Sequence, residues 1–291
     1  MVLNKSMESM PSQVKITADS TCDLPDAVLR RYGIGLVPLY VTLGDRSFRD
    51  RLEISPKELY AYADRTGRLP KTSAVTVRDY LDYFTPYQLA GKSVVHFTIS
   101  RSMSACYQNA VSAANALGNV RVIDSANLSS GIGLLAVRAA ELAAAGLDAD
   151  SICADIRGRI PKVEASFVID TLKYLHKGGR CSSVAALGAN LLSLKPCIEV
   201  KNGAMEVGKK YRGSLEKCLR AYVTDRLKGR ADLDLARIFV THSPLPPRLA
   251  EKVVRWIGGL APFGEIIDTD ASCTICTHCG PGTLGILFLR K

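Results

Sequence analysis

Short apolar segments alternate with helix-like segments along the first half of the chain. The segments at 14–18, 34–43, 94–99 and 120–124 are dominated by Val, Ile and other apolar residues, a pattern that predicts strands. Apolar strands that alternate with helices commonly lie parallel, with helices over both faces. This half therefore predicts an α/β fold with a doubly wound, mostly parallel sheet.

Local signals mark the helices between these strands. The sequence SPKE at 55–58 is a capping box with Pro at the first helical position, so a helix begins there. Further helices are predicted over 25–33, 102–117 and 134–146, the last with a broad apolar face.

The pattern changes after about residue 160. Asn-Gly at 202–203 separates two strand-like segments and is a strong hairpin signal. Helices are predicted before the glycines at 178–179 and over 182–192. This half indicates α+β structure with antiparallel pairing, and its predicted strands are 163–169, 197–200, 205–211, 235–241 and 264–270.

The length of 291 residues fits one large domain or two ordinary ones, and two agrees better with the change of pattern. We expect a disordered lead-in at 1–13, an α/β domain at 14–158 and an α+β domain at 159–291. No apolar run approaches the ~20 residues that a membrane-spanning helix needs. The polar N-terminus lacks the apolar core of a signal peptide, and the nine cysteines are widely spaced, so we expect a cytoplasmic protein with reduced thiols.

The net charge of +10 predicts an acidic partner: nucleic acid, an anionic membrane surface or an acidic protein. The basic residues are scattered, without a long run or an alternation with aromatic residues. We therefore expect no nucleic-acid partner. Transient contact with an anionic membrane surface, peripheral to its inner face, is a hypothesis.

Hydroxyl-bearing residues follow the predicted parallel strands. Ser20 and Thr21 follow the first strand, and Ser100, Arg101 and Ser102 follow the strand at 94–99. Ligands of open parallel sheets bind at these strand ends, and the N–H groups of a following helix favour an anion. The residues are equally typical of helix N-caps. The chain has no GxGxxG motif after a predicted strand and no GxxxxGK[ST] motif, so a nucleotide is not indicated.

Three further features have both a functional and a structural interpretation. Arg180 follows two glycines and supplies a permanent cation, or it is a surface residue after an ordinary helix end. His278 lies in a loop with Gly and Pro, where it can donate a hydrogen bond or serve the fold. Cys273, Cys276 and Cys279 have the spacing of part of a metal site, but a fourth ligand is missing. No GxSxG elbow of a serine hydrolase is present.

Eight segments in order resemble motifs of the bacterial DegV family of fatty-acid-binding proteins. The match extends over nearly the whole chain, from about Val14 to Phe288. The segments are ITADSTCDL at 16–24, KTS at 71–73, ISRSMSACYQ at 99–108, VIDS at 122–125, YLHKGGR at 174–180, KP at 195–196, YRG at 211–213 and HCGPG at 278–282.

The resemblance implies an α/β domain followed by an α+β domain, with a long-chain fatty acid in a buried tunnel. By position, Thr72, Ser100 and His278 would hold the carboxylate. Arg180 and Arg212 would lie near the mouth, toward a partner kinase or the incoming phosphate. The remaining candidate ligand contacts are Ser73, Arg101, Ser102, Ser20 and Thr21.

The resemblance further implies a lipid-binding subunit and not an enzyme. A fatty acid kinase would phosphorylate the bound acid for phospholipid synthesis, with no catalytic residue, metal or cofactor in this chain beyond the bound acid. The alternative is a stand-alone phosphotransferase or hydrolase acting on a small acidic substrate, since the family's sheet is distantly like that of dihydroxyacetone kinases. The chain departs from the family pattern at Arg101 and at Ala74-Val75. It also departs at Cys106 and Cys279, two positions where hydroxyl residues are common in the family. Arg101 would either strengthen the carboxylate clamp or point outward.

Overall fold

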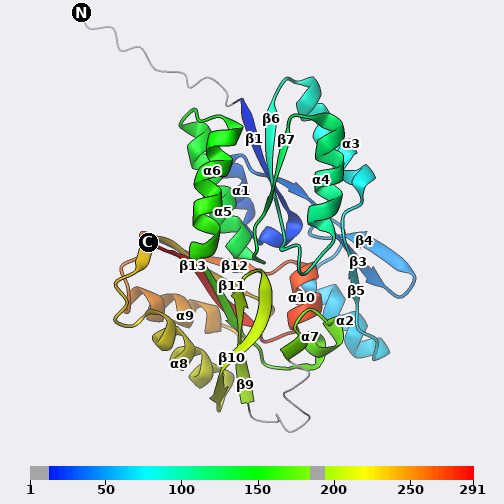
Figure 1. The fold of residues 1–291 in the computed structure, drawn as a ribbon. Helices are drawn as coiled ribbons and strands as arrows, with labels where there is room; N and C mark the ends of the chain where they lie inside the picture. The colour runs from blue at the N-terminus through cyan, green and yellow to red at the C-terminus, as the bar shows by residue number, and fades with distance from the viewer. Residues whose placement is uncertain (1–12, 184–193) are drawn as a thin grey trace, which may run out of the picture.

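The computed structural model describes residues 13–183 and 194–291 (Figure 1). Its first sheet has four parallel strands in the order β2-β1-β6-β7. The strands are β1 (Val14–Asp19), β2 (Gly35–Val37), β6 (Ser93–Thr98) and β7 (Val120–Asp124). One face packs against α3 (Val77–Leu89) and α4 (Cys106–Leu117), and the other against α5 (Ser130–Ala144) and α6 (Ala149–Arg159), with α1 (Asp26–Tyr32) beside α5. This sheet confirms the predicted doubly wound arrangement.

The second sheet has six strands in the order β10-β9-β8-β13-β11-β12. Neighbouring strands are antiparallel except β11 and β12. Helices α8 (Leu215–Leu227) and α9 (Leu249–Gly258) cover one face, while α5 lies against the other. The strands are β8 (Val163–Val168), β9 (Leu194–Lys201), β10 (Ala204–Arg212), β11 (Leu233–His242), β12 (Glu265–Asp270) and β13 (Leu284–Arg290).

A small third sheet, in the order β4-β3-β5, carries the segment that bears Thr72. Its strands are β3 (Tyr40–Leu43), β4 (Arg46–Arg49) and β5 (Lys71–Ser73). Helix α10 (Cys273–Cys279) packs against this sheet and against α2 (Pro56–Thr66) and α7 (Lys173–Gly178). Two short 3-10 turns complete the described structure, η1 (Ser20–Cys22) and η2 (Ile160–Lys162).

Several predicted elements have the predicted local chemistry. Ser55 and Glu58 form both hydrogen bonds of the capping box at the start of α2. The hairpin of β9 and β10 turns at Asn202 and Gly203, whose φ angles of 52° and 81° are the left-handed values that this turn requires.

Other boundaries differ from the prediction. The segment 34–43 is two strands in different sheets, because Pro38 has no N–H to continue the ladder. Helix α4 begins at Cys106 and not near 102, since Ser100 closes a turn with the N–H groups of Ser102 and Met103. The predicted helix at 182–192 lies almost entirely outside the described residues, as does the predicted lead-in at 1–13.

The central strands of the second sheet, β8 and β13, are buried on both faces. Side chains alternate along a strand, so Phe167, Phe239 and Leu287 face α5 while Ile238 and Phe288 join the core under α8 and α9. The largest buried cluster thus joins residues from both predicted domains. The predicted boundary at 158/159 falls in the last turn of α6, and the division into two domains remains a prediction.

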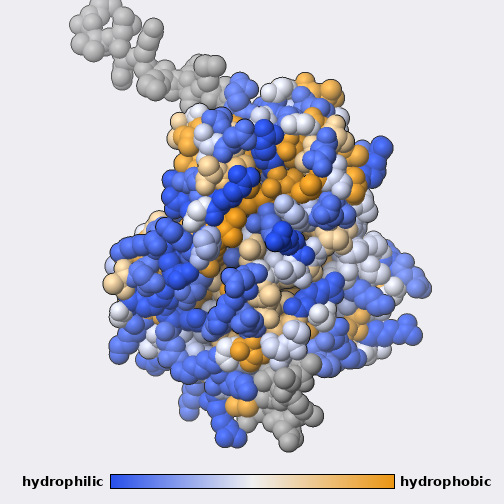
Figure 2. All heavy atoms as spheres, viewed as in Figure 1, coloured by the Kyte–Doolittle hydropathy of each residue, from blue (hydrophilic) through white to orange (hydrophobic). Residues whose placement is uncertain are grey.

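The surface is mostly hydrophilic in the view of Figure 2, where hydrophobic residues gather in a hollow between α5/α6 and α4. Within 13–183 and 194–291, no helix is both long enough and apolar enough to cross a bilayer.

Candidate functional site

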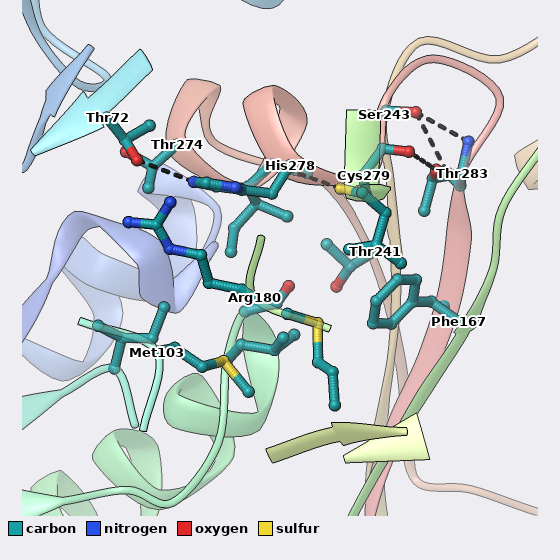
Figure 3. Close-up of a pocket in the computed structure, with 18 of the residues that line it drawn as sticks. Thr72, Met103, Phe167, Arg180, Thr241, Ser243, Thr274, His278, Cys279 and Thr283 are labelled. Carbon is teal, nitrogen blue, oxygen red and sulfur yellow. Dashed lines mark hydrogen bonds between the residues drawn. The ribbon is translucent and has the colours of Figure 1, made fainter. Parts of the chain in front are cut away.

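A cavity lies where α10, β5, the turn after β6 and the α5-facing side of the second sheet meet (Figure 3). We call it the main cavity. It holds about 860 Å³ of empty space, counting the open part at its mouth. Its walls are mostly apolar and include Leu39, Met103, Phe167, Leu175, Met205 and Leu287.

Two polar side chains meet at one end of the main cavity. Thr72 projects from β5 and His278 from α10, and Thr72 Oγ1 lies 2.8 Å from His278 Nε2. Both residues line the cavity. Strand pairing of β5 with β3 and packing of α10 on the same sheet fix their relative position. This predicted pair is therefore brought together from segments 206 residues apart.

The imidazole of His278 is neutral. Burial, and then the nearby positive charge of Arg180, lower the pKa of His278 to about 4. His278 Nδ1 is closed off from solvent and has no hydrogen-bond partner in the described part of the chain. A buried N–H without an acceptor is rarer than a carbonyl or lone pair without a donor. We therefore assign the proton to Nε2, which donates to Thr72 Oγ1 and leaves the Thr72 hydroxyl to donate to a ligand.

The glycines before Arg180 have distinct roles. Gly179 ends α7 with a φ of 69°, as expected of a C-cap. Gly178 packs against the imidazole: a Cβ at Gly178 would lie 2.6 Å from His278 Nδ1. Arg180 is exposed, donates to the carbonyl of Gly178 at 2.8 Å and lines the main cavity on its Thr72 side. A permanent cation thus stands beside a neutral hydrogen-bonding pair.

Two buried carboxylates hold the N-terminus of α10. Asp50 accepts from the N–H of Cys273 and the hydroxyl of Ser20, both at 2.9 Å. Asp23 accepts from the N–H of Ser272 at 2.9 Å and from the hydroxyl of Ser129 at 2.6 Å. Burial raises the pKa of both carboxyl groups, that of Asp23 to about 7. The motif at 16–24 therefore positions the helix that carries His278.

The sequence and fold of this chain are similar to those of known proteins over nearly its whole length. Residues 13–291 match the model of the DegV family of uncharacterised proteins. The chain belongs to the DegV family. A DegV domain-containing protein of Clostridium acetobutylicum is 31% identical, over 96% of this chain and 99% of its own length. A fatty acid-binding protein of Thermotoga maritima is 30% identical, over 94% of this chain and 96% of its own length.

Solved DegV structures share the fold. A fatty acid-binding DegV family protein of Thermus thermophilus superposes with a TM-score of 0.85 at 28% identity, covering 96% of this chain and 99% of that one. A DegV lipid-binding protein of Thermotoga maritima superposes with a TM-score of 0.84 at 27% identity. The superposition covers 95% of this chain and 98% of that one. The predicted fold class is confirmed.

The other predicted contact residues of this DegV chain lie in different places. Ser73 lines the main cavity beside Thr72. The buried hydroxyl of Ser100 donates to the carbonyl of Gly203 at 2.6 Å and so ties the β9–β10 hairpin to the end of β6. Ser100 and Ser102 do not line the cavity defined by the described residues, and Ser102 is exposed. Arg101 points outward, with its side chain 71% exposed and its Nε 3.4 Å from Asp124.

Ser20, Thr21 and Arg212 also lie outside the lining that the described residues form. Ser20 donates a hydrogen bond to Asp50, and Thr21 is buried in the same 3-10 turn, η1. Arg212 is exposed at the end of β10. Their predicted contacts with ligand or partner remain predictions.

Several lining residues of this DegV cavity were not anticipated from the sequence. Thr241 and Ser243, at the end of β11, and Thr283, before β13, form a second polar group. Their hydroxyls are engaged internally: Thr241 with Ser130 at 2.6 Å, and Thr283 with the carbonyl of Cys279 at 2.9 Å. Only the spatial arrangement of β11 and β13 reveals them, because their local sequence is that of ordinary strand ends.

The alternative of a metal centre on α10 has no geometric support. Each thiol is directed to a different backbone carbonyl, Cys273 to Ile54, Cys276 to Ala271 and Cys279 to Ile275. Over the part of the chain that the structure describes, no group of three His, Cys, Asp or Glu side chains is arranged to hold a metal ion.

Proposed function

We propose that this protein binds one long-chain fatty acid in the main cavity, with the carboxylate at the Thr72–His278 end. The observation that carries the proposal is a largely apolar cavity that ends in a neutral, preorganised hydrogen-bonding pair beside an exposed arginine. Relatives and solved structures of the DegV family that bind fatty acids support it.

The polar end suits a carboxylate. The Thr72 hydroxyl would donate to one carboxylate oxygen, and such charge-assisted hydrogen bonds are stronger than neutral ones. His278 orients that hydroxyl through Nε2. Arg180 favours the anion electrostatically from the mouth. Because the direct donor is uncharged, the carboxylate keeps much of its nucleophilicity.

The apolar walls suit an acyl chain. Transfer of a methylene from water contributes ~0.8 kcal/mol, so burying ten methylenes would contribute ~8 kcal/mol before the cost of ordering the chain. Met103 and Met205 both line the cavity, and their flexible side chains can adapt to the shape of an acyl chain. No covalent attachment is needed to retain the ligand.

Calorimetric titration of delipidated protein with palmitate tests the head-group assignment. Thr72→Val keeps the shape and removes the hydroxyl, whereas Thr72→Ser keeps the hydroxyl. We expect Thr72→Val to weaken binding by about tenfold to a hundredfold, the value of a hydrogen bond to a charged group. Thr72→Ser should bind nearly as the wild type does. Equal affinity of all three would place the carboxylate elsewhere.

We further propose that the bound acid is presented to a separate kinase, which forms the acyl phosphate. The exposed Arg180 at the mouth and the family resemblance support this step. Acyl phosphate formation should require the protein, a fatty acid kinase catalytic subunit and ATP together. Arg180→Ala should reduce turnover, and Arg255→Ala, which removes an exposed charge from α9, should not. Turnover with ATP in the absence of a kinase would instead support the stand-alone phosphotransferase, which the comparisons do not favour.

Contact with an anionic membrane surface during ligand exchange is a second proposed property, motivated by the net charge of +10. It predicts sedimentation with vesicles that contain anionic lipid and release by added salt. Binding that ignores both lipid charge and salt would contradict it.

A further inference from the structure

A second group of hydroxyl side chains lines the main cavity, apart from Thr72. Figure 3 draws Thr241 of this group away from Thr72, with His278 between them in the view. A fatty acid whose carboxylate lies at Thr72 would therefore meet this group with another part of the molecule. The group consists of Ser129 at the start of α5, Thr241 and Ser243 at the end of β11, and Thr283 before β13.

Three of these hydroxyls donate to acceptors of the protein itself. Ser129 donates to the carboxylate of Asp23 at 2.6 Å. Thr283 donates to the carbonyl of Cys279 at 2.9 Å, and Ser243 donates to the carbonyl of Thr283 at 3.4 Å. Each of these hydroxyls has one proton, so none of the three has a proton left for a ligand.

The hydroxyl of Thr241 has a different partner, the hydroxyl of Ser130. The two oxygens lie 2.6 Å apart, and neither hydroxyl has another hydrogen-bond partner among the described residues. The pair holds two hydroxyl protons, and the hydrogen bond between the two oxygens uses only one of them. One proton of the pair is therefore left without an acceptor in the described structure.

Burial decides which of the two hydroxyls keeps the spare proton. Ser130 is fully buried and is not among the described lining residues, whereas Thr241 lines the cavity. A spare proton on Ser130 would be a buried donor that no ligand in the cavity can reach, and such a donor costs free energy. Ser130 therefore donates to Thr241, and Thr241 keeps a proton that it can donate to a ligand.

The surroundings of Thr241 leave room for an acceptor but give little access to bulk water. Gly285 on β13 is the register partner of Thr241 and also lines the cavity, so no side chain from that position fills the space beside the hydroxyl. Thr241 is only 5% exposed. The spare donor thus lies at the wall of a largely enclosed, mostly apolar space.

An unsubstituted acyl chain offers no acceptor to this donor, so covering the donor with methylene groups costs free energy. A hydroxyl or keto oxygen on the chain would accept the proton and remove that cost. We propose that the main cavity prefers a fatty acid whose chain carries such an oxygen, bound by Thr241, over the unsubstituted acid of the same length. This inference rests on the proposed function, since a carboxylate at Thr72 directs the acyl chain toward Thr241.

Calorimetric titration of delipidated protein tests the preference. The ligands are stearate, its 3-, 10- and 12-hydroxy derivatives and its 10- and 12-oxo derivatives. The wild type should bind at least one substituted acid about tenfold more tightly than stearate, the value of one hydrogen bond that also pairs a buried donor. Comparison of hydroxy and oxo acids separates an oxygen that also donates from one that only accepts.

Thr241→Val keeps the shape of the side chain and removes the hydroxyl. This variant should lose the preference, while its binding of stearate shows that it is folded. Thr269→Val is the matched control. Thr269 is the register partner of Thr241 on β12, and its hydroxyl donates to the carbonyl of Asp23, outside the lining that the described residues form. Thr269→Val should therefore retain the preference.

The outcomes separate this inference from the proposed function. If stearate binds the wild type as tightly as every substituted acid does, an ordered water satisfies Thr241 and the inference is overturned. A preference that persists in Thr241→Val would also overturn it. If none of the acids binds, the proposed function itself fails, and this inference fails with it.

Discussion

At the polar end of the main cavity, Gly178 and His278 are in close contact. A methyl group at position 178 would lie 2.6 Å from His278 Nδ1, so the imidazole would have to move away from Thr72. Gly178→Ala is therefore expected to lower fatty acid affinity by about tenfold, through loss of the oriented hydroxyl.

Gly158→Ala is the matched control, since a Cβ there meets no atom within 4 Å. Within α6 the added methyl should leave affinity unchanged and raise stability by about 0.5–1 kcal/mol. Titration with palmitate and chemical denaturation measure the two effects. Unchanged affinity in Gly178→Ala would show that His278 does not position Thr72.

The protonation state of His278 makes a second prediction at this scale. Burial and the charge of Arg180 lower the pKa of His278 to about 4, so the imidazole should remain neutral well below pH 6 in an NMR titration. Removing a positive charge favours protonation, so Arg180→Gln should raise that pKa, and Arg255→Gln should not. Titration of His278 near 6.5 in the wild type would contradict the assignment.

At the scale of elements, α10 is held at its N-terminus by Asp23, whose pKa is raised to about 7 mainly by burial. The unfolded-state value is about 3.9. Because the pKa of Asp23 is higher in the folded state, its protonated carboxyl group stabilises the folded state relative to the unfolded state. This contribution to the free energy of unfolding is complete below about pH 4 and is lost as the pH rises to about 7. At 1.36 kcal/mol per unit, the loss is on the order of 4 kcal/mol.

Asp23→Asn cannot titrate and keeps an acceptor for the Ser272 N–H. Its free energy of unfolding should therefore fall less between pH 4 and pH 7 than that of the wild type. Asp26→Asn, at a side chain 74% exposed, should retain the wild-type profile. Denaturation at a series of pH values gives the comparison, and parallel curves for wild type and Asp23→Asn would refute the role of Asp23.

The elements themselves were largely predictable where the signal is local. The capping box at Ser55 and the turn at Asn202 involve neighbouring residues, and the structure has both. The division of 34–43 between two sheets was not predicted, although Pro38 marks the break. Which sheet each half joins depends on residues far away in the sequence.

The candidate site was predictable only in part. Motif resemblance identified Thr72 and His278, and the structure brings them within 2.8 Å. It did not reveal that Ser100 is engaged with the β9–β10 hairpin, or that Arg101 points to solvent. Side-chain direction after a strand end is set by the turn that follows, which motif order does not encode.

For the whole molecule, the buried thiols give a further prediction. All nine cysteines are free and buried, and burial raises the pKa of Cys22 and Cys106 to about 12. The thiolate is the reactive form of cysteine, so the native protein should react slowly with Ellman's reagent. The denatured protein should release nine equivalents of the thionitrobenzoate chromophore, one for each thiol. Immediate reaction of several thiols in the native state would contradict the burial.

The central claim for the whole molecule is that the main cavity holds a fatty acid by its carboxylate at Thr72 and His278. Mass spectrometry of an organic extract of the purified protein tests it most directly, with Thr72→Ala and His278→Ala beside the wild type. We predict one equivalent of a long-chain fatty acid in the wild type and a reduced content in both variants. A wild-type extract without fatty acid, or equal content in all three proteins, would contradict the account.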